Sequence, residues 1–266
     1  MEIIGYMAAI LIGLSLGLIG GGGSILTVPV LVYLFGLETE QATLYSLMVV
    51  GTTSLTGVIG AYKRGQLDVK MSLMYAAVSV LIVVITRRLL LPLIPMELFT
   101  LGGFAVTKSI ATMLLLAVLM LLAAISMIRK KQGAIETPAS THQHKGINIQ
   151  LVMNAALIGF ITGLLGAGGG FLLIPALVFV QHLPMKKAVG TSLLIITLNS
   201  LIGFLADAPG HTLDWTLLLG ITAMAILGIL LGGRLGRKIS SAPLQKGFGW
   251  FVLVMGCYII FLELVK

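Results

Sequence analysis

A cluster of glycines interrupts an apolar stretch twice in this chain, at equivalent places in its two halves. The two strings span residues 18–29 and 164–175, and their glycines are 146 positions apart, as Gly20 and Gly166 show. Glycine breaks a helix, and broken backbone inside a bilayer is tolerated only where protein or a water-filled cavity covers it. Two breaks in corresponding positions therefore predict a duplicated transporter whose site is built from interrupted helices.

The composition places the chain in a membrane. It has 266 residues, of which 58% are hydrophobic and only 10% are charged. A soluble domain of this size needs far more charge on its surface. The net charge of +8 comes from basic residues in short loops between apolar runs, so it indicates membrane topology rather than nucleic-acid binding. We expect an all-α polytopic membrane protein.

Each half contains about five apolar segments. They cover roughly residues 3–19, 24–37, 42–61, 70–90 and 101–128, and then 148–165, 170–182, 187–206, 214–232 and 247–264. This predicts an N-terminal membrane repeat (1–128), a cytoplasmic linker (129–146) and a C-terminal membrane repeat (147–266). Residues 24–37 would reach only about 21 Å as a helix, less than the roughly 30 Å of hydrocarbon. The two segments around each glycine cluster therefore form either a short hairpin that dips into the membrane or two short crossings of it. In both cases the chain returns to the side that it left.

The charges orient this arrangement. With ten segments, most lysines and arginines fall in the connections on one side and most acidic residues on the other. The positive-inside rule makes the basic side cytoplasmic and puts both termini outside. If each broken pair crossed the membrane only once, the basic loops would be scattered over both faces. Because five crossings are an odd number, the second half begins on the opposite side from the first, which predicts an inverted repeat.

The glycine clusters are candidate anion-binding segments. A helix that begins after such a break points unpaired backbone N–H groups and a partial positive charge at it. The candidate residues are Gly20, Gly21, Gly22, Gly23 and Ser24 in the first half, and Gly166, Gly168, Gly169 and Gly170 in the second. A nucleotide phosphate loop is disfavoured because no Gly-Lys-Ser/Thr follows. The alternative is that the glycines only permit close helix packing, which we expect of Gly228, Gly232 and Gly236.

Polar residues in the third segment of each half are the second set of candidates. Ser46 and Thr53 lie seven residues apart and so share a helix face, and their repeat equivalents are Ser192 and Asn199. The complete set is Ser46, Thr52, Thr53, Thr191, Ser192, Asn199 and Ser200. These side chains either donate hydrogen bonds to a bound anion or bond between helices.

Ionisable residues are scarce in the predicted spans. No aspartate or glutamate lies squarely within one, so the uncharged core is compatible with a uniporter, with transport of a protonated substrate, or with an ion site. Arg87, Arg88 and Lys108 are the exceptions, on the acidic outer side. They either extend to the interface or form an electropositive vestibule that attracts anions. We find no metal-binding spacing, cofactor loop or catalytic set, and therefore expect no metal, no cofactor and no enzyme activity.

The strings Gly17–Pro29 and Gly163–Pro175 resemble the sulfite exporter TauE/SafE family of membrane permeases, as do Ala188–Leu193 and Gly232–Gly236. The first half departs from the pattern, since Tyr45 stands where the second half has Thr191. Ile82, Thr86 and Leu90 likewise stand where the second half has Gly228, Gly232 and Gly236.

The resemblance implies a secondary transporter of small sulfur anions, such as sulfite, thiosulfate or sulfonates, in a prokaryotic inner membrane. Its partners would be a small inorganic or organosulfonate anion and the lipid bilayer, with no nucleic acid, and a homo-oligomer stays open. The alternative is a membrane scaffold or accessory subunit that transports nothing.

Overall fold

The computed structural model describes residues 2–95, 97–101, 104–129, 149–166, 168–181, 183–209, 211–236 and 241–265. The first half contains α1 (Glu2–Ile19), the 3₁₀ helix η1 (Gly21–Leu26), α2 (Thr27–Tyr33), α3 (Thr39–Lys63), α4 (Val69–Ile85), the π-helical turn η2 (Thr86–Leu90), α5 (Leu91–Leu93), β1 (Glu97–Leu101), β2 (Phe104–Thr107) and α6 (Lys108–Arg129). The second half contains α7 (Ile149–Leu165), α8 (Gly170–Pro175), the π-helical turn η3 (Ala176–Val180), α9 (Met185–Asp207), α10 (Trp215–Leu235) and α11 (Ser241–Val265). Of the predicted linker, only Arg129 falls within the described residues.

Helices dominate the structure, as expected of an all-α polytopic membrane protein. Five helical stretches are long and apolar enough to cross a bilayer, namely α3, 69–93, 108–126, α9 and α10. The described parts of α1, α7 and α11 are shorter apolar helices, as is the stretch 23–33 that follows the first break. The predicted segments correspond to these helices, except that the segment 170–182 is divided into α8 and η3 and α11 begins six residues before its predicted segment.

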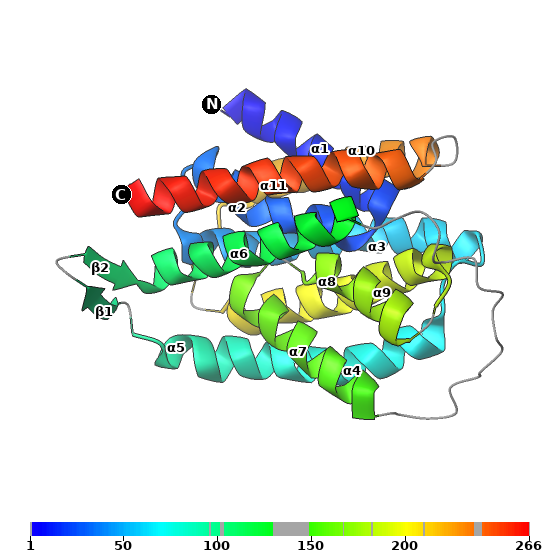
Figure 1. Cartoon of the computed structure of the whole chain (residues 1–266), viewed down its shortest axis with the longest axis horizontal. Coiled ribbons are helices and arrows are strands. Elements are labelled where there is room, and N and C mark those ends of the chain that lie inside the picture. The colour runs from blue at the N-terminus through cyan, green and yellow to red at the C-terminus, as the bar shows by residue number, and fades with distance from the viewer. Residues whose placement is uncertain are drawn as a thin grey trace.

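The predicted segment 101–128 is wrong at its start. Residues 97–107 form the antiparallel hairpin β1–β2, and the helix begins only at Lys108. The hairpin projects from one end of the bundle in Figure 1. Its sequence is rich in aromatic and β-branched residues, which favour strands over helix, although their hydropathy resembles that of a membrane helix.

The two halves make equivalent contacts. α1 packs on α10, and its repeat equivalent α7 packs on α4, while α3 packs on α10 as α9 packs on α4. Three further contacts pair an element with its equivalent in the other half: α3 with α9, α6 with α11, and η1 with α8. Figure 1 shows α6 and α11 side by side along the bundle. The packing is therefore symmetric between the halves, as the predicted duplication requires.

The contacts also give the helix directions. α3 and α9 run in opposite directions, since Gly51 lies against Leu201 and Gly57 against Leu193. α10 runs parallel to α3, and α4 runs parallel to α9. α1 in turn runs parallel to α10, and α7 parallel to α4. Equivalent helices of the two halves thus point in opposite directions, which an inverted repeat requires, while their orientation in the bilayer stays a prediction.

Small residues set the closest helix contact. A side chain at Gly228 or Gly232 of α10 would overlap the backbone of α1, and one at Gly13 or Gly17 of α1 would overlap α10. Backbones approach this closely only where glycine faces glycine or backbone. The packing role expected for Gly228 and Gly232 is confirmed.

The chain around the first break returns to the end where it started. Tyr6, near the start of α1, packs edge-to-face on Phe35, just beyond α2, with ring centroids 5.5 Å apart. Tyr33 at the end of α2 donates a 2.8 Å hydrogen bond to Glu263, near the end of α11. The start of α1, the end of α2 and the end of α11 therefore lie at one end of the bundle.

Cysteine labelling tests the membrane orientation. In a Cys257→Ala background, single cysteines at the exposed positions Glu38 and Thr212 should react from outside, and those at the exposed positions Lys63 and Lys187 only from the cytoplasm. The measurement is reaction with a membrane-impermeant maleimide in intact cells and in lysed cells. If positions 63 and 187 react from opposite sides, the five-plus-five arrangement is wrong.

Candidate functional site

The two glycine breaks touch each other in the middle of the fold. A Cβ added to Gly21 would overlap the backbone of Gly170, and one added to Gly170 would overlap Gly21. Gly20 and Gly168 have φ angles of 77° and 67°, in the left-handed region that glycine adopts at little cost. The glycines are therefore required both for the turns and for the approach of η1 to α8.

Not every backbone N–H in the breaks is available. The N–H of Gly20 donates to the carbonyl of Leu16, and that of Gly166 to the carbonyl of Thr162, both at 2.9 Å. These two groups end α1 and α7, so the prediction that they bind an anion is corrected. The backbone candidates that remain are residues 21–23 and 168–170.

Polar helices flank the breaks on both sides. Gly20 lies against Val189 and Ser192 of α9, and Gly168 lies against Val50 of α3 and Ser200 of α9. The position of a Cβ on Gly168 would be 3.2 Å from the Ser200 hydroxyl. Ser46 and Thr53 share the helix face of Val50, four residues before it and three after it. The third segment of each half is thus brought to the breaks.

Buried polar groups lie on the two helices that reach the breaks, and Ser200 is the one that lies against Gly168. Ser46, Thr53 and Ser54 of α3 and Asn199 and Ser200 of α9 are all fully buried. Among the described residues, the four hydroxyls and the Asn199 amide nitrogen have no hydrogen-bond partner. A buried polar group left without a partner costs about 1–3 kcal/mol. All five can donate hydrogen bonds, which suits an acceptor such as an oxyanion.

Asn199 is held in one orientation. Its Oδ1 accepts a 2.8 Å hydrogen bond from the hydroxyl of Ser79 on α4. The amide nitrogen therefore points away from Ser79 with both of its hydrogens available. Ser79 was not among the predicted site residues, because its partner lies 120 residues away.

Other candidates already use their polar groups within the protein. The hydroxyl of Ser24 donates to the carbonyl of Gly21, and that of Ser192 to the carbonyl of Val189, both at 2.8 Å. Thr191 accepts from the backbone N–H of Asp68 at the start of α4, and Thr52 contacts the sulfur of Met48 at 3.9 Å. A hydroxyl has one proton, so Ser24 and Ser192 have none left for an anion.

Two polar residues beside the breaks were missed. Ser54 is the repeat equivalent of Ser200, and the 146-residue spacing could have identified it. Thr162 lies against Gly169, and its buried hydroxyl has no partner in the described part of the chain. Its equivalent in the first half is Leu16, so the repeat carried no signal for it.

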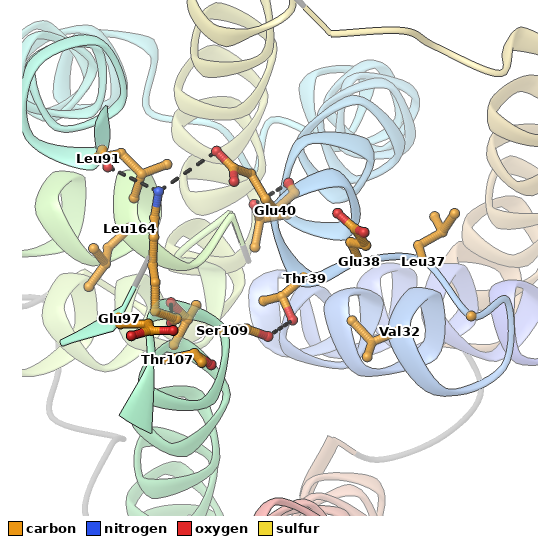
Figure 2. A pocket seen from close by; sticks show the side chains of 14 residues that line it. Val32, Leu37, Glu38, Thr39, Glu40, Leu91, Glu97, Thr107, Ser109 and Leu164 are labelled. Carbon is orange, nitrogen blue, oxygen red and sulfur yellow. Dashed lines mark hydrogen bonds and ion pairs between the residues drawn. The ribbon is translucent and has the colours of Figure 1, made fainter. Parts of the chain in front are cut away.

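A pocket of about 630 Å³ opens at the end of the bundle that carries the hairpin. Figure 2 shows the side chains of Glu38, Glu40 and Glu97 around it. Lys108 of α6 also lines it. Thr43 also lines the pocket, and its backbone lies against Gly166. The pocket therefore leads toward the second glycine break.

The three predicted vestibule cations do not form one open positive surface. Arg87 is buried and ion-paired with Asp207, so it does not extend to the interface. Arg88 donates to the carbonyl of Ala206 at 3.1 Å. Lys108 donates to the carbonyl of Leu91 at 3.0 Å and lies 3.7 Å from Glu40. Three carboxylates against one lysine give the pocket a negative lining.

Comparison with known proteins identifies a family and several relatives that are similar to this chain. The family "Sulfite exporter TauE/SafE" matches residues 6–259. A probable membrane transporter protein of Xylella fastidiosa (strain Temecula1) is 28% identical, over 94% of this chain and 91% of its own length. The probable membrane transporter protein YunE of Bacillus subtilis is also 28% identical, over 96% of this chain and 97% of its own. No solved structure matches the chain significantly. The chain therefore belongs to the sulfite exporter TauE/SafE family.

Proposed function

We propose that this protein is a secondary transporter that moves a small sulfur oxyanion, such as sulfite, thiosulfate or a sulfonate, across the plasma membrane by alternating access. One observation carries the proposal: five buried donors without partners in the described chain lie on α3 and α9, the two helices that reach the glycine breaks through Val50 and Ser200. The family and the names of the relatives support a membrane transporter. The sulfur oxyanion is our inference from the donor chemistry together with the family.

The donors suit a small anion because they are neutral and fixed. Ser46, Thr53, Ser54 and Ser200 offer hydroxyl protons, and Asn199 offers its amide. Hydrogen bonds to a charged ligand contribute about 1.5–3 kcal/mol each, so a few of them hold an anion without a cationic side chain. Such a site releases its ligand more readily than a site built on arginines does. A transporter requires this ready release.

The repeat supplies a route to alternating access. The donors come from α3 and α9, which are equivalent helices running in opposite directions across the contact of the breaks. Rocking of one repeat against the other around this contact would open the site first to one side and then to the other. The pocket that leads to Gly166 is the outer approach in this arrangement, and an anion enters it against the repulsion of its three carboxylates.

Flux into proteoliposomes tests the function. Purified protein should accumulate at least one of radiolabelled sulfite, thiosulfate, sulfate or sulfoacetate above protein-free vesicles, and an excess of the same unlabelled anion should suppress the uptake. If folded protein moves none of these anions, the transporter proposal fails and a scaffold or accessory subunit is favoured. Uptake of a cation or a neutral sugar in place of the anions would also contradict it.

A further inference from the structure

Five buried donors, which we call the donor set, were described above: Ser46, Thr53, Ser54, Asn199 and Ser200. Arg87 is not one of them, but it too has N–H groups without acceptors among the described residues. It sits on η2, between α4 and α5, and its side chain is 0% exposed. Its Nη1 donates to Oδ2 of Asp207 at the end of α9. Its Nε and Nη2 are buried, and neither has a hydrogen-bond partner within the described ranges.

These two nitrogens form one edge of the guanidinium. Nε–H and one Nη2–H point in parallel from that edge, which is the geometry that binds two oxygens of one oxyanion. The carboxylate of Asp207, on the remaining nitrogen, fixes the plane of the group. Ionisable groups buried in a membrane protein are expensive to keep and mark substrate pathways. π-Helical turns such as η2 are also frequent at functional sites.

The position of Arg87 links the outer pocket to the donor set. Leu91, one turn further along, lines the pocket and accepts a hydrogen bond from Lys108 (Figure 2). Glu40 also lines the pocket and lies 3.7 Å from Lys108. In the other direction, Ser79 lies two turns before Arg87, about 12 Å along the helix, and orients Asn199.

The other half shows that the fold does not require this ion pair. The repeat equivalents of Arg87 and Asp207 are Gly233 and Ala61. Ala61 is buried, and no described atom lies within 4 Å of where a Cβ on Gly233 would be. The equivalent positions on α10 and α3 therefore carry no ion pair. A pair present at only one end of a duplicated structure points to a role specific to that end.

We propose that Arg87 is an anion-binding residue of the outer pathway: its Nε–Nη2 edge binds two oxygens of the sulfur oxyanion between the pocket and the donor set. Asp207 is a positioning residue, which orients the guanidinium and competes electrostatically with the anion. This inference rests on the proposed function, since it assigns one binding residue on the transport pathway of the same substrate.

Equilibrium binding and flux should be measured on the same purified proteins, with radiolabelled sulfite, thiosulfate and sulfate as separate probes. Arg87→Lys keeps the charge but loses the two-donor edge, so it should raise Kd and KM about tenfold or more with little change in kcat. Asp207→Asn still accepts from Nη1 but no longer repels an anion, so it should lower Kd. Arg64→Lys is the matched control. Arg64 directly follows α3, at the end of the bundle opposite to Arg87, so this variant should bind as the wild type does.

The outcomes separate this inference from the proposed function. Wild-type Kd in Arg87→Lys, or no binding of any probe by folded wild-type protein, overturns the role of Arg87. Binding that Arg87→Lys weakens, in a protein that moves none of the anions, supports Arg87 and contradicts transport. If Arg87→Lys does not fold, Asp207→Asn decides: tighter binding supports the role, and unchanged Kd with lower stability marks a purely structural ion pair.

Discussion

Gly170→Ala should lower both the stability and the transport rate of the purified protein, whereas Gly233→Ala should lower neither. The added methyl group at Gly170 would overlap the backbone of Gly21, so η1 and α8 must move apart. Overpacking of this kind costs about 1–3 kcal/mol, and backbone offers no rotamer through which to relax. The same displacement would widen the donor set, and we therefore expect transport per folded molecule to fall about tenfold or more.

Gly233 provides the matched control because no described atom lies within 4 Å of the position of an added Cβ. Alanine there should leave stability unchanged or raise it by up to about 1 kcal/mol through helix propensity. Apparent melting temperatures in detergent and flux per folded protein measure the two effects. Equal behaviour of the two variants would mean that the breaks do not pack against each other as described.

Much of the fold follows from the glycine repeat and the hydropathy of the chain. The spacing of 146 residues pairs helices that make equivalent contacts, since α1 packs on α10 as α7 packs on α4. The hairpin at residues 97–107 was missed because hydropathy does not distinguish an apolar strand from an apolar helix. Its preference for strands comes from β-branched and aromatic side chains, and the prediction of membrane segments considered only hydropathy.

The site was predictable as a region but not group by group. Spacing put Ser46 and Thr53 on the same face of α3 as Val50, which lies against Gly168, while the roles of Ser46, Thr53 and Asn199 stay predictions. It could not show that the Ser24 and Ser192 hydroxyls donate to carbonyls of their own helical segments, because that depends on rotamers. The pairing of Arg87 with Asp207 joins residues 120 positions apart, and no local pattern indicates it.

Asn199→Leu should abolish transport while leaving a folded and inserted protein. Leucine is close to asparagine in volume but offers no hydrogen bond, so the two amide hydrogens are lost to the ligand. At about 1.5–3 kcal/mol for each bond to a charged group, affinity should fall about a hundredfold or more. Stability should hold or rise, because the variant removes a buried amide nitrogen for which the described residues provide no partner. Ser79 would keep the carbonyl of Ala76 as an acceptor, at 3.5 Å in this structure.

Asn154→Leu is the control, since Asn154 lies on α7 and bonds only to the carbonyl of Gln150 among the hydrogen bonds of the described chain. It should transport and melt as the wild type does. Ser79→Ala should fall between the two, because Asn199 stays present but loses the bond that orients it. The competing explanation, that Asn199 only bonds α9 to α4, predicts the reverse pattern: Asn199→Leu and Ser79→Ala would both lower the melting temperature by similar amounts, and the protein that remained folded would transport normally. Melting temperature and flux per folded molecule, measured on the same preparations, decide between ligand donor and interhelical bond.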